Sequence, residues 1–280
     1  MKQRIYKLIM SLFVAAILGS CGTTSILSNA DPETIYEVSM DYYERGKYAK
    51  AARCFENVLT YYVGSNLEDS IMFFTAKSKF KDEDYYSAIS YFEEYRKRHY
   101  RSHLLEDAEG MMTLSYYYTS AGPERDQTGT EMAIASIDEF FSRHPDSDKV
   151  DDFRSIREEL VQRLYDRSFL NAYTYYKIGY YKSAIVALKN ALREYPESSN
   201  REKIMYYMIM AAFELADNSI EELENDRHMA VIDMYYTFIA EFPRSQYKKE
   251  IDKKVAVSRT FLQTSDPSLL ENKGETILSK

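Results

Sequence analysis

Residues 166–200 carry the pattern that most constrains the fold, an alternation of small and bulky side chains at helical spacing. Three of these residues follow one another at i, i+4 and i+7, namely Ala184, Leu188 and Ala191. Because an α-helix has about 3.6 residues per turn, the three side chains lie on one face. The alanines let a neighbouring backbone approach closely, and the leucine fills the space beside them. The pattern therefore predicts a helix that packs tightly along this face.

Turn residues bound this helix on both sides. Gly179 predicts a tight turn after a preceding tyrosine-rich helix. Pro196 predicts that the second helix ends near Tyr195, because proline lacks an amide hydrogen and disfavours helix in the residue before it. This order of small, aromatic, glycine and proline positions resembles the 34-residue tetratricopeptide helical hairpin. The chain departs from that pattern in having no tryptophan.

Related segments extend along the chain, and we expect an all-α tetratricopeptide-repeat superhelix of about five helical hairpins. They lie at about 32–65, 67–102, 104–145, 166–200 and 201–243. A loop at 121–128 interrupts the third hairpin, and a further helix at 148–165 precedes the fourth. An acidic insert at 217–226 divides the fifth, and a last helix is expected at 246–261.

The N-terminal residues resemble the start of a bacterial lipoprotein. A basic start precedes an apolar run at 8–18, too short to span a bilayer as a helix, which leads into Leu-Gly-Ser-Cys at 18–21. Small residues before a cysteine resemble a lipobox, in which cleavage leaves Cys21 as the lipidated N-terminus, carrying palmitate. Several acyl chains would anchor the protein stably, since each buried methylene adds about 0.8 kcal/mol. The alternative is an ordinary signal peptide cut near Ser20, which leaves Cys21 as a free thiol.

These features divide the chain into four predicted parts. They are a lipoprotein signal peptide (1–20), a lipidated flexible tether (21–31), a five-repeat domain (32–262) and a disordered polar tail (263–280). Within the third part, Asp31-Pro32 is expected to start the first helix, with Asp31 as its cap.

Charge and cysteine content restrict the possible partners. The chain has a formal charge of −8, and loss of the signal peptide, whose three charges are all positive, leaves 33 basic against 44 acidic residues, or −11. Such a chain has no electrostatic basis for binding nucleic acid. Only Cys54 remains beside the lipidated Cys21, so no internal disulfide is available. We expect Cys54, next to Phe55 on a predicted helix, to be a small core residue.

The residue patterns of enzymes are missing from the sequence. It has no glycine-rich phosphate loop and no Gly-x-Ser-x-Gly nucleophile elbow. His99 and His103 have the i,i+4 spacing of a helical metal site, but they fall where a repeat should turn, so we favour a solvated turn over a metal site. We expect His144 at a helix end and His228 on the surface. The prediction is a non-enzymatic protein without metal or cofactor.

One local motif is more specific. Glu-Arg-Asp-Gln-Thr at 124–128 precedes a helix that ends in Arg-His-Pro-Asp-Ser at 143–147. With the lipoprotein signal and the five hairpins, these residues resemble the BamD family, lipoprotein subunits of the outer-membrane β-barrel assembly machine. That family carries a similar Arg-Asp-Gln-Thr before a helix closed by Arg, an aromatic residue, Pro, Asn or Asp, and Ser. Tyr-Pro-Glu-Ser at 195–198 and Phe-Pro-Arg-Ser at 242–245 repeat that ending.

The resemblance covers about residues 30–250 and has two departures. His144 replaces the aromatic residue of the motif, and the insert at 217–228 has no counterpart, which leaves the partner surface of the fifth repeat in doubt. The resemblance implies a location at the outer membrane, lipid-anchored on its periplasmic face. No acidic run follows Cys21, and we take this to favour the periplasm over the cell exterior.

The family resemblance also implies two kinds of partner. Its C-terminal repeats bind BamA within the multi-subunit machine, and its N-terminal repeats contact unfolded outer-membrane proteins that end in an aromatic-containing strand. The family's basic residue after the fourth repeat pairs with an acid on BamA, and Arg201 stands nearest to that place. The alternative is that Arg201 is a plain residue at the start of a helix.

The substrate-binding residues are predicted to form an apolar groove with a basic rim. Tyr36, Met40 and Tyr43 lie at i, i+4 and i+7 and so form one stripe on the first hairpin. The groove results if this stripe faces the concave side beside Phe73, Lys77 and Phe80. The aromatic end of a peptide would bury its ring there and place its carboxylate near Lys77. The alternative is that the stripe packs within the array.

Two other functions stay open on the sequence alone. One is a generic tetratricopeptide lipoprotein scaffold of the cell envelope, against which the loop at 125–128 argues. The other is a glycan-binding lipoprotein of the SusD type, but such chains are much longer and build their sugar sites with tryptophan, which this chain lacks.

Overall fold

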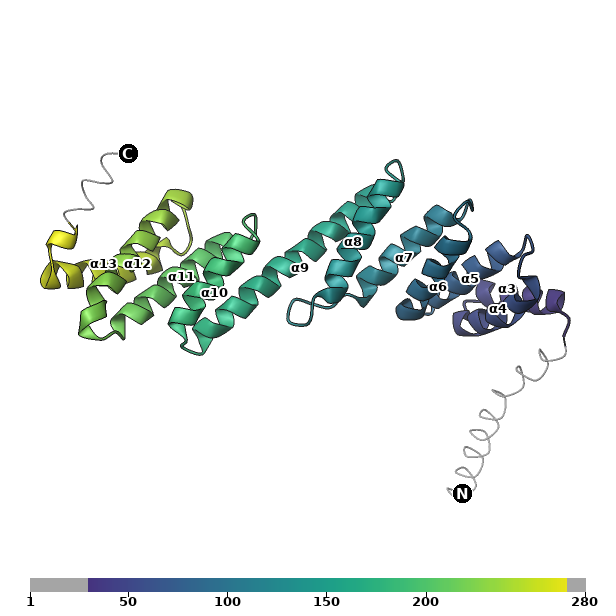
Figure 1. Cartoon of the computed structure of the whole chain (residues 1–280), viewed down its shortest axis with the longest axis horizontal. Coiled ribbons are helices and arrows are strands. Elements are labelled where there is room, and N and C mark those ends of the chain that lie inside the picture. The colour runs from purple at the N-terminus through teal and green to yellow at the C-terminus, as the bar shows by residue number, and fades with distance from the viewer. Residues whose placement is uncertain (1–29, 271–280) are drawn as a thin grey trace, which may run out of the picture. The chain divides into compact units, whose positions relative to one another are not determined.

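The computed structural model describes residues 30–270, and all of their regular structure is helical (Figure 1). The helices are α3 (Pro32–Glu44), α4 (Tyr48–Tyr62), α5 (Glu68–Lys81), α6 (Tyr85–Arg98), α7 (Leu105–Thr119), α8 (Thr128–Arg143), α9 (Val150–Lys177), α10 (Tyr181–Glu194), α11 (Arg201–Asp217), α12 (Glu221–Glu241) and α13 (Lys248–Ser265). This confirms the predicted all-α fold of consecutive helical hairpins. None of these helices is long and apolar enough to cross a bilayer. The predicted signal peptide, Cys21, most of the tether and the end of the predicted tail lie outside the described residues.

The chain folds as two compact units. Unit 1 contains described residues 30–119 and 138–149, and unit 2 contains 120–137 and 150–270. Helix α8 supplies residues to both units.

Unit 1 is built around two neighbouring apolar clusters. The first joins α3, α4 and α5 through Ile35, Ala51, Phe55, Val58 and Ile71. The second joins α5, α6 and α7 through Met72, Phe73, Ala76, Ala88, Phe92, Tyr95, Ala108 and Met112. Both pair alanines with large side chains, the combination that lets helices approach closely. Cys54 is buried on α4, as predicted.

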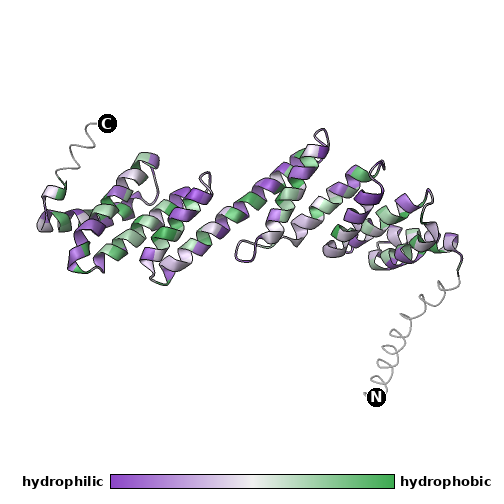
Figure 2. Ribbon diagram, in the orientation of Figure 1, coloured by the Kyte–Doolittle hydropathy of each residue, from purple (hydrophilic) through white to green (hydrophobic). Residues whose placement is uncertain are grey.

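Unit 2 contains the hairpin α9–α10, whose packing follows the register expected from the sequence. Ala184, Leu188 and Ala191 are at most 3% exposed, and Leu188 and Ala191 share one apolar cluster with residues of α9 and α11. The hairpin turns at Gly179, which takes φ of +80°, and α10 ends at Glu194, before Pro196. A further apolar cluster joins α11, α12 and α13, and α11 contributes most of its buried residues. Figure 2 shows α11 as largely hydrophobic.

One turn recurs between successive hairpins, always with a serine at its end. The serines are Ser65, Ser102, Ser147, Ser198 and Ser245. Each serine amide donates to the carbonyl three residues earlier at 2.9–3.2 Å, and each serine Oγ accepts from the amide two residues later at 3.0–3.2 Å. The serine thereby satisfies an amide near the start of the next helix. The last three turns contain the Pro-x-Ser endings seen in the sequence, and the first two lack the proline.

The turn within the second hairpin uses a residue other than glycine. The corresponding turns of the first and fourth hairpins have Gly46 and Gly179 at positive φ, whereas Glu83 takes φ of +61° here. This conformation costs a side-chain-bearing residue about 1–2 kcal/mol relative to its ordinary backbone conformation. The start of α3 agrees with the sequence, since Asp31 Oδ1 accepts from the Thr34 amide at 2.9 Å.

The sequence-based boundaries are wrong in three places. The helix expected at 148–165 and the first helix of the fourth hairpin are one continuous helix, α9. The acidic insert is mostly helix as well, because α12 begins at Glu221, where acidic side chains favour a helix N-terminus. Helix α13 continues to Ser265, and residues 268–270 form a further helical turn whose leucines pack against unit 2, so the ordered fold passes the boundary at 262.

His228 is a further correction, since it is buried rather than on the surface. It is 3% exposed, between Phe213 and Phe261, and its Nδ1 lies 3.0 Å from Ser258 Oγ. Because α12 starts earlier than expected, its first turns pack on α13, and His228 falls on the packed face. Burial lowers the pKa of His228 below the ordinary value of 6.5.

Candidate partner-binding surfaces

A row of aromatic side chains in unit 1 surrounds one lysine. The Lys77 ammonium lies 5.9 Å from the centroid of the Tyr43 ring, 5.4 Å from Phe73 and 5.8 Å from Phe74. Tyr43 also meets Phe74 edge-on at 5.2 Å. These distances are within the range of cation–π attraction, which fixes the lysine among the rings. Among residues 30–270, Lys77 forms no ion pair with a carboxylate.

Some of the predicted groove residues belong to the packed cores of the hairpins, and others lie at the edge of these cores. Tyr36 meets Phe55 edge-on at 6.3 Å, and Met40 packs against the same cluster, so both are largely part of the packing of the first hairpin. Phe73 is 3% exposed and belongs to the core of the second hairpin. Tyr43 and Lys77 are half-buried and lie at the edge of these clusters.

Phe80 continues the aromatic row into residues that the sequence did not single out. Its ring lies 5.7 Å from Tyr85 and 6.2 Å from Tyr118, and these two tyrosines stack at 4.7 Å. Tyr118 is 50% exposed, so the row ends at the surface. Tyr85 and Tyr118 lie 33 residues apart in the chain, and only the packing of α7 beside α5 and α6 shows that they meet.

Arg201, the predicted BamA contact, has a partner within unit 2. Its Nη2 donates to Glu241 Oε2 at 3.0 Å and its Nε donates to Oε1, a two-pronged ion pair between α11 and α12. The bond from Arg201 lowers the pKa of Glu241. Both side chains are about one third exposed, at 35% and 34%.

An apolar groove adjoins this ion pair on unit 2. It has a volume of about 400 Å³, and its lining includes Arg201 and the apolar side chains Leu192, Met205, Met208 and Met234. Methionine is flexible and polarisable, so such a lining adapts to apolar side chains of different shapes.

The Arg-Asp-Gln-Thr motif closes the loop before α8. Gln127 is 8% exposed, and its amide donates to the carbonyls of Gly122 at 2.8 Å and Arg125 at 3.0 Å. Its Oε1 accepts from Thr130 Oγ1 at 2.8 Å. Arg167 of α9 donates to the Glu124 carbonyl at 2.9 Å. The conformation of the motif is thus fixed by bonds within unit 2.

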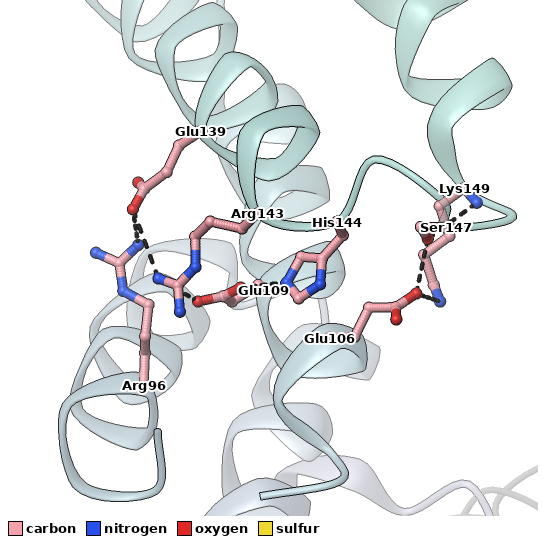
Figure 3. Close-up of polar contacts among 8 residues, drawn as sticks. All are labelled: Arg96, Glu106, Glu109, Glu139, Arg143, His144, Ser147 and Lys149. Carbon is pink, nitrogen blue, oxygen red and sulfur yellow. Dashed lines mark hydrogen bonds and ion pairs between the residues drawn. The ribbon is translucent and has the colours of Figure 1, made fainter. Parts of the chain in front are cut away.

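The other half of the motif holds the end of α8 to α7 within unit 1, as Figure 3 shows. Glu109 of α7 is buried, and His144 Nε2 lies 2.6 Å from its Oε2. Arg143 Nη1 lies 2.8 Å from Glu109 Oε1 without a hydrogen bond, so that contact is an ion pair alone. His144 is therefore at a helix end, as predicted, and it meets a buried carboxylate there.

No metal centre is present in the part of the chain that the structure describes. Within residues 30–270, no three histidine, cysteine, aspartate or glutamate side chains are placed to hold a metal ion. His99 lies at the C-terminal end of α6, where its ring is 5.2 Å from Tyr95, and His103 is exposed in the following turn.

Comparison with known proteins identifies the family. The sequence profile of YfiO, described as an outer membrane lipoprotein family, matches residues 28–169 and 162–266. The chain belongs to this outer membrane lipoprotein family. A relative from Aquifex aeolicus (strain VF5), provisionally named outer membrane protein assembly factor BamD, is 27% identical over 210 residues, which cover 74% of this chain and 69% of the relative. The expected membership in the BamD family is confirmed.

Solved structures include a chain similar to this one, in the TPR2AB-domain:pHSP90-complex of yeast Sti1. It is 14% identical with a TM-score of 0.38, over 81% of this chain and 98% of the other.

Proposed function

We propose that this outer membrane lipoprotein is a non-enzymatic subunit of the machinery that folds and inserts outer-membrane β-barrel proteins. In this role unit 2 binds BamA and unit 1 binds unfolded barrel segments. Family membership and the relative named BamD support the proposal. The observation that carries the substrate part is the lysine held among aromatic rings in unit 1.

The chemistry of this lysine suits the end of a peptide chain. Lys77 has three rings within 6 Å, while no carboxylate of residues 30–270 pairs with it. A C-terminal aromatic residue supplies what is missing, because its carboxylate pairs with the ammonium and its ring packs against Phe80 and Tyr118. Lys77, Phe80 and Tyr118 together would therefore bind a terminal carboxylate next to an aromatic side chain.

Photo-crosslinking tests this substrate site. In one variant a photoreactive amino acid replaces Tyr118, which is 50% exposed. In the control variant it replaces Tyr61 of α4, which is 64% exposed. A peptide that ends in phenylalanine with a free carboxylate should crosslink at position 118 and not at 61, and its amidated form should crosslink less. Lys77→Met should weaken binding of the free carboxylate about tenfold or more, since a hydrogen bond to a charged group contributes about 1.5–3 kcal/mol. Equal crosslinking at both positions would contradict the site.

The contact with BamA is tested by reversing the internal ion pair of unit 2. Arg201→Glu and Glu241→Arg each place like charges together, whereas the double variant restores an internal pair with reversed polarity. If Arg201 meets an acid on BamA, the double variant should recover the stability of unit 2 but still fail to co-purify BamA. If the double variant recovers both, Arg201 serves only the packing of α11 on α12.

The proposal places the protein at the outer membrane, anchored through lipid on Cys21 and facing the periplasm. Family membership supports the membrane location. Protease added to intact cells should leave the chain whole, and rapid degradation would contradict the periplasmic placement.

A further inference from the structure

Unit 2 contains a second open cleft, which the proposed function does not use. It has a volume of about 330 Å³ and lies between the start of α8, the C-terminal half of α9 and the second half of α10. This is at the lower end of the range for small-molecule pockets, about 300–1,000 Å³, so it has room for one or two long side chains. Tyr175 on its wall is 43% exposed, so the cleft opens to solvent.

The cleft carries more negative than positive charge. Glu131 and Glu194 line it and are exposed, and the Glu131 carboxylate pairs with no described residue. The one cation among the lining residues, Arg167, is turned to the loop before α8, where its Nη1 donates to the Glu124 carbonyl at 2.9 Å. Burial and the Glu194 carboxylate, with a smaller effect of Glu131, raise the pKa of Tyr195. Both acids line the same cleft as Tyr195.

The remaining lining suits a peptide backbone. Three alanines form part of it, at 172, 187 and 191; Ala172 and Ala191 are at most 3% exposed and belong to the packing between α9 and α10, whereas Ala187 is half-buried, and its small side chain lets another main chain approach closely. The exposed amides of Asn171 and Asn190 come from facing helices. An asparagine side chain both donates and accepts, so it can bond the peptide groups of an extended segment in either direction. Among residues 30–270, Asn171 makes no side-chain hydrogen bond, and Asn190 uses only its oxygen, which accepts from Arg193 at 3.1 Å.

We propose that this cleft binds an extended peptide segment that carries a lysine or arginine. The cationic side chain lies between Glu131 and Glu194 and over the ring of Tyr175, and the peptide groups bond to Asn171 and Asn190. Charge complementarity selects this occupant, since two carboxylates and a tyrosine face attract a cation by ion pairing and by the cation–π effect. An acidic or phosphorylated segment would be repelled by the same carboxylates.

Tryptophan fluorescence tests the cleft directly, because the chain has no tryptophan of its own. Tyr175→Trp places one reporter on the cleft wall, and Tyr86→Trp places a control on a side chain of unit 1 that is 75% exposed. The full chain in detergent is titrated with the peptides Gly-Ser-Arg-Gly-Arg-Ser-Gly and Gly-Ser-Glu-Gly-Glu-Ser-Gly. The arginine peptide should change the emission at position 175 and leave that at position 86 unchanged, and the glutamate peptide should change neither.

Charge variants separate a specific cleft from general attraction to an acidic protein. Glu131→Gln with Glu194→Gln should weaken binding of the arginine peptide at least tenfold. The matched control, Glu197→Gln with Glu221→Gln, removes two exposed acids outside the cleft and should change the affinity less than twofold. Equal weakening by both pairs would overturn the proposal in favour of bulk electrostatic attraction, as would equal binding of the two peptides. An unchanged helical circular dichroism spectrum confirms that each variant is folded.

Discussion

The buried carboxylate of Glu109 provides the sharpest test of how unit 1 is held together. Its side chain is 4% exposed and lies between Arg143, 36% exposed, and His144, 17% exposed. Glu109→Gln keeps the shape of the side chain, removes the negative charge and turns an NH2 group, in place of one carboxylate oxygen, toward either Arg143 or His144. Removing one partner of a buried ion pair costs about 3–5 kcal/mol. Because Arg143 keeps access to water, we expect a loss of about 2–3 kcal/mol.

A neighbouring glutamate supplies the control. Glu139 lies on α8, is 47% exposed, and forms an ion pair with Arg96 at 2.7 Å. Pairs with this degree of exposure contribute about 0.2–1 kcal/mol, so Glu139→Gln should change the stability by less than 1 kcal/mol.

Hydrogen exchange followed by mass spectrometry is the suitable assay, because the two units need not unfold together. Glu109→Gln should accelerate the exchange of amides in α7 and in residues 138–149, and leave α11 unchanged. Equal effects of the Glu109 and Glu139 substitutions would refute this reasoning. So would a loss of stability below about 0.5 kcal/mol in Glu109→Gln, because ordinary surface substitutions have effects of that size.

Three further predictions concern other parts of the chain. Burial lowers the folded-state pKa of His228, so the unfolded chain binds a proton more readily than the folded chain. Stability should therefore fall as the pH drops through 6.5. The urea midpoints of unfolding at about pH 7.5 and 5.5 should differ less in His228→Phe than in the unchanged protein. Ala184→Leu should overpack the α9–α10 hairpin and cost about 1–3 kcal/mol, whereas Glu197→Ala, at an exposed turn, should change the melting temperature little. Cys21→Ala should move the protein into the soluble periplasmic fraction, and its retention in membranes after a high-salt wash would contradict lipid attachment as the main anchor.

Local patterns predicted most of the helices because the signals act over short distances. The face formed by Ala184, Leu188 and Ala191, the turn at Gly179 and the stop at Pro196 each depend on neighbouring residues, and all three are confirmed. The failures fall where local signals are weak. No proline or glycine near residue 165 marks whether the helix ends or continues, and the structure shows that α9 continues. The acidic residues at 221–226 are typical both of a solvated loop and of a helix N-terminus, and the structure shows the helix.

The contacts of the candidate sites could not be predicted, because they join residues far apart in the chain. The ion pair of Arg201 spans 40 residues to Glu241, and that of Glu109 spans 35 residues to His144. The sequence placed Lys77 beside Phe73 and Phe80 through helical spacing, yet Tyr118 joins this row only through the packing of α7. Likewise, Tyr36 and Met40 share a stripe with Tyr43 but serve mainly the first hairpin's own packing.

Depletion of the protein in its own cells tests the central claim, a role in outer-membrane β-barrel assembly, most directly. The measurement is the amount of folded barrel protein in the outer membrane, detected by its resistance to unfolding in detergent without heating. The account predicts that folded barrels decline and unfolded ones accumulate in the periplasm, that the intact gene restores them, and that the Arg201→Glu variant does not. Normal amounts of folded barrels after complete depletion would contradict it.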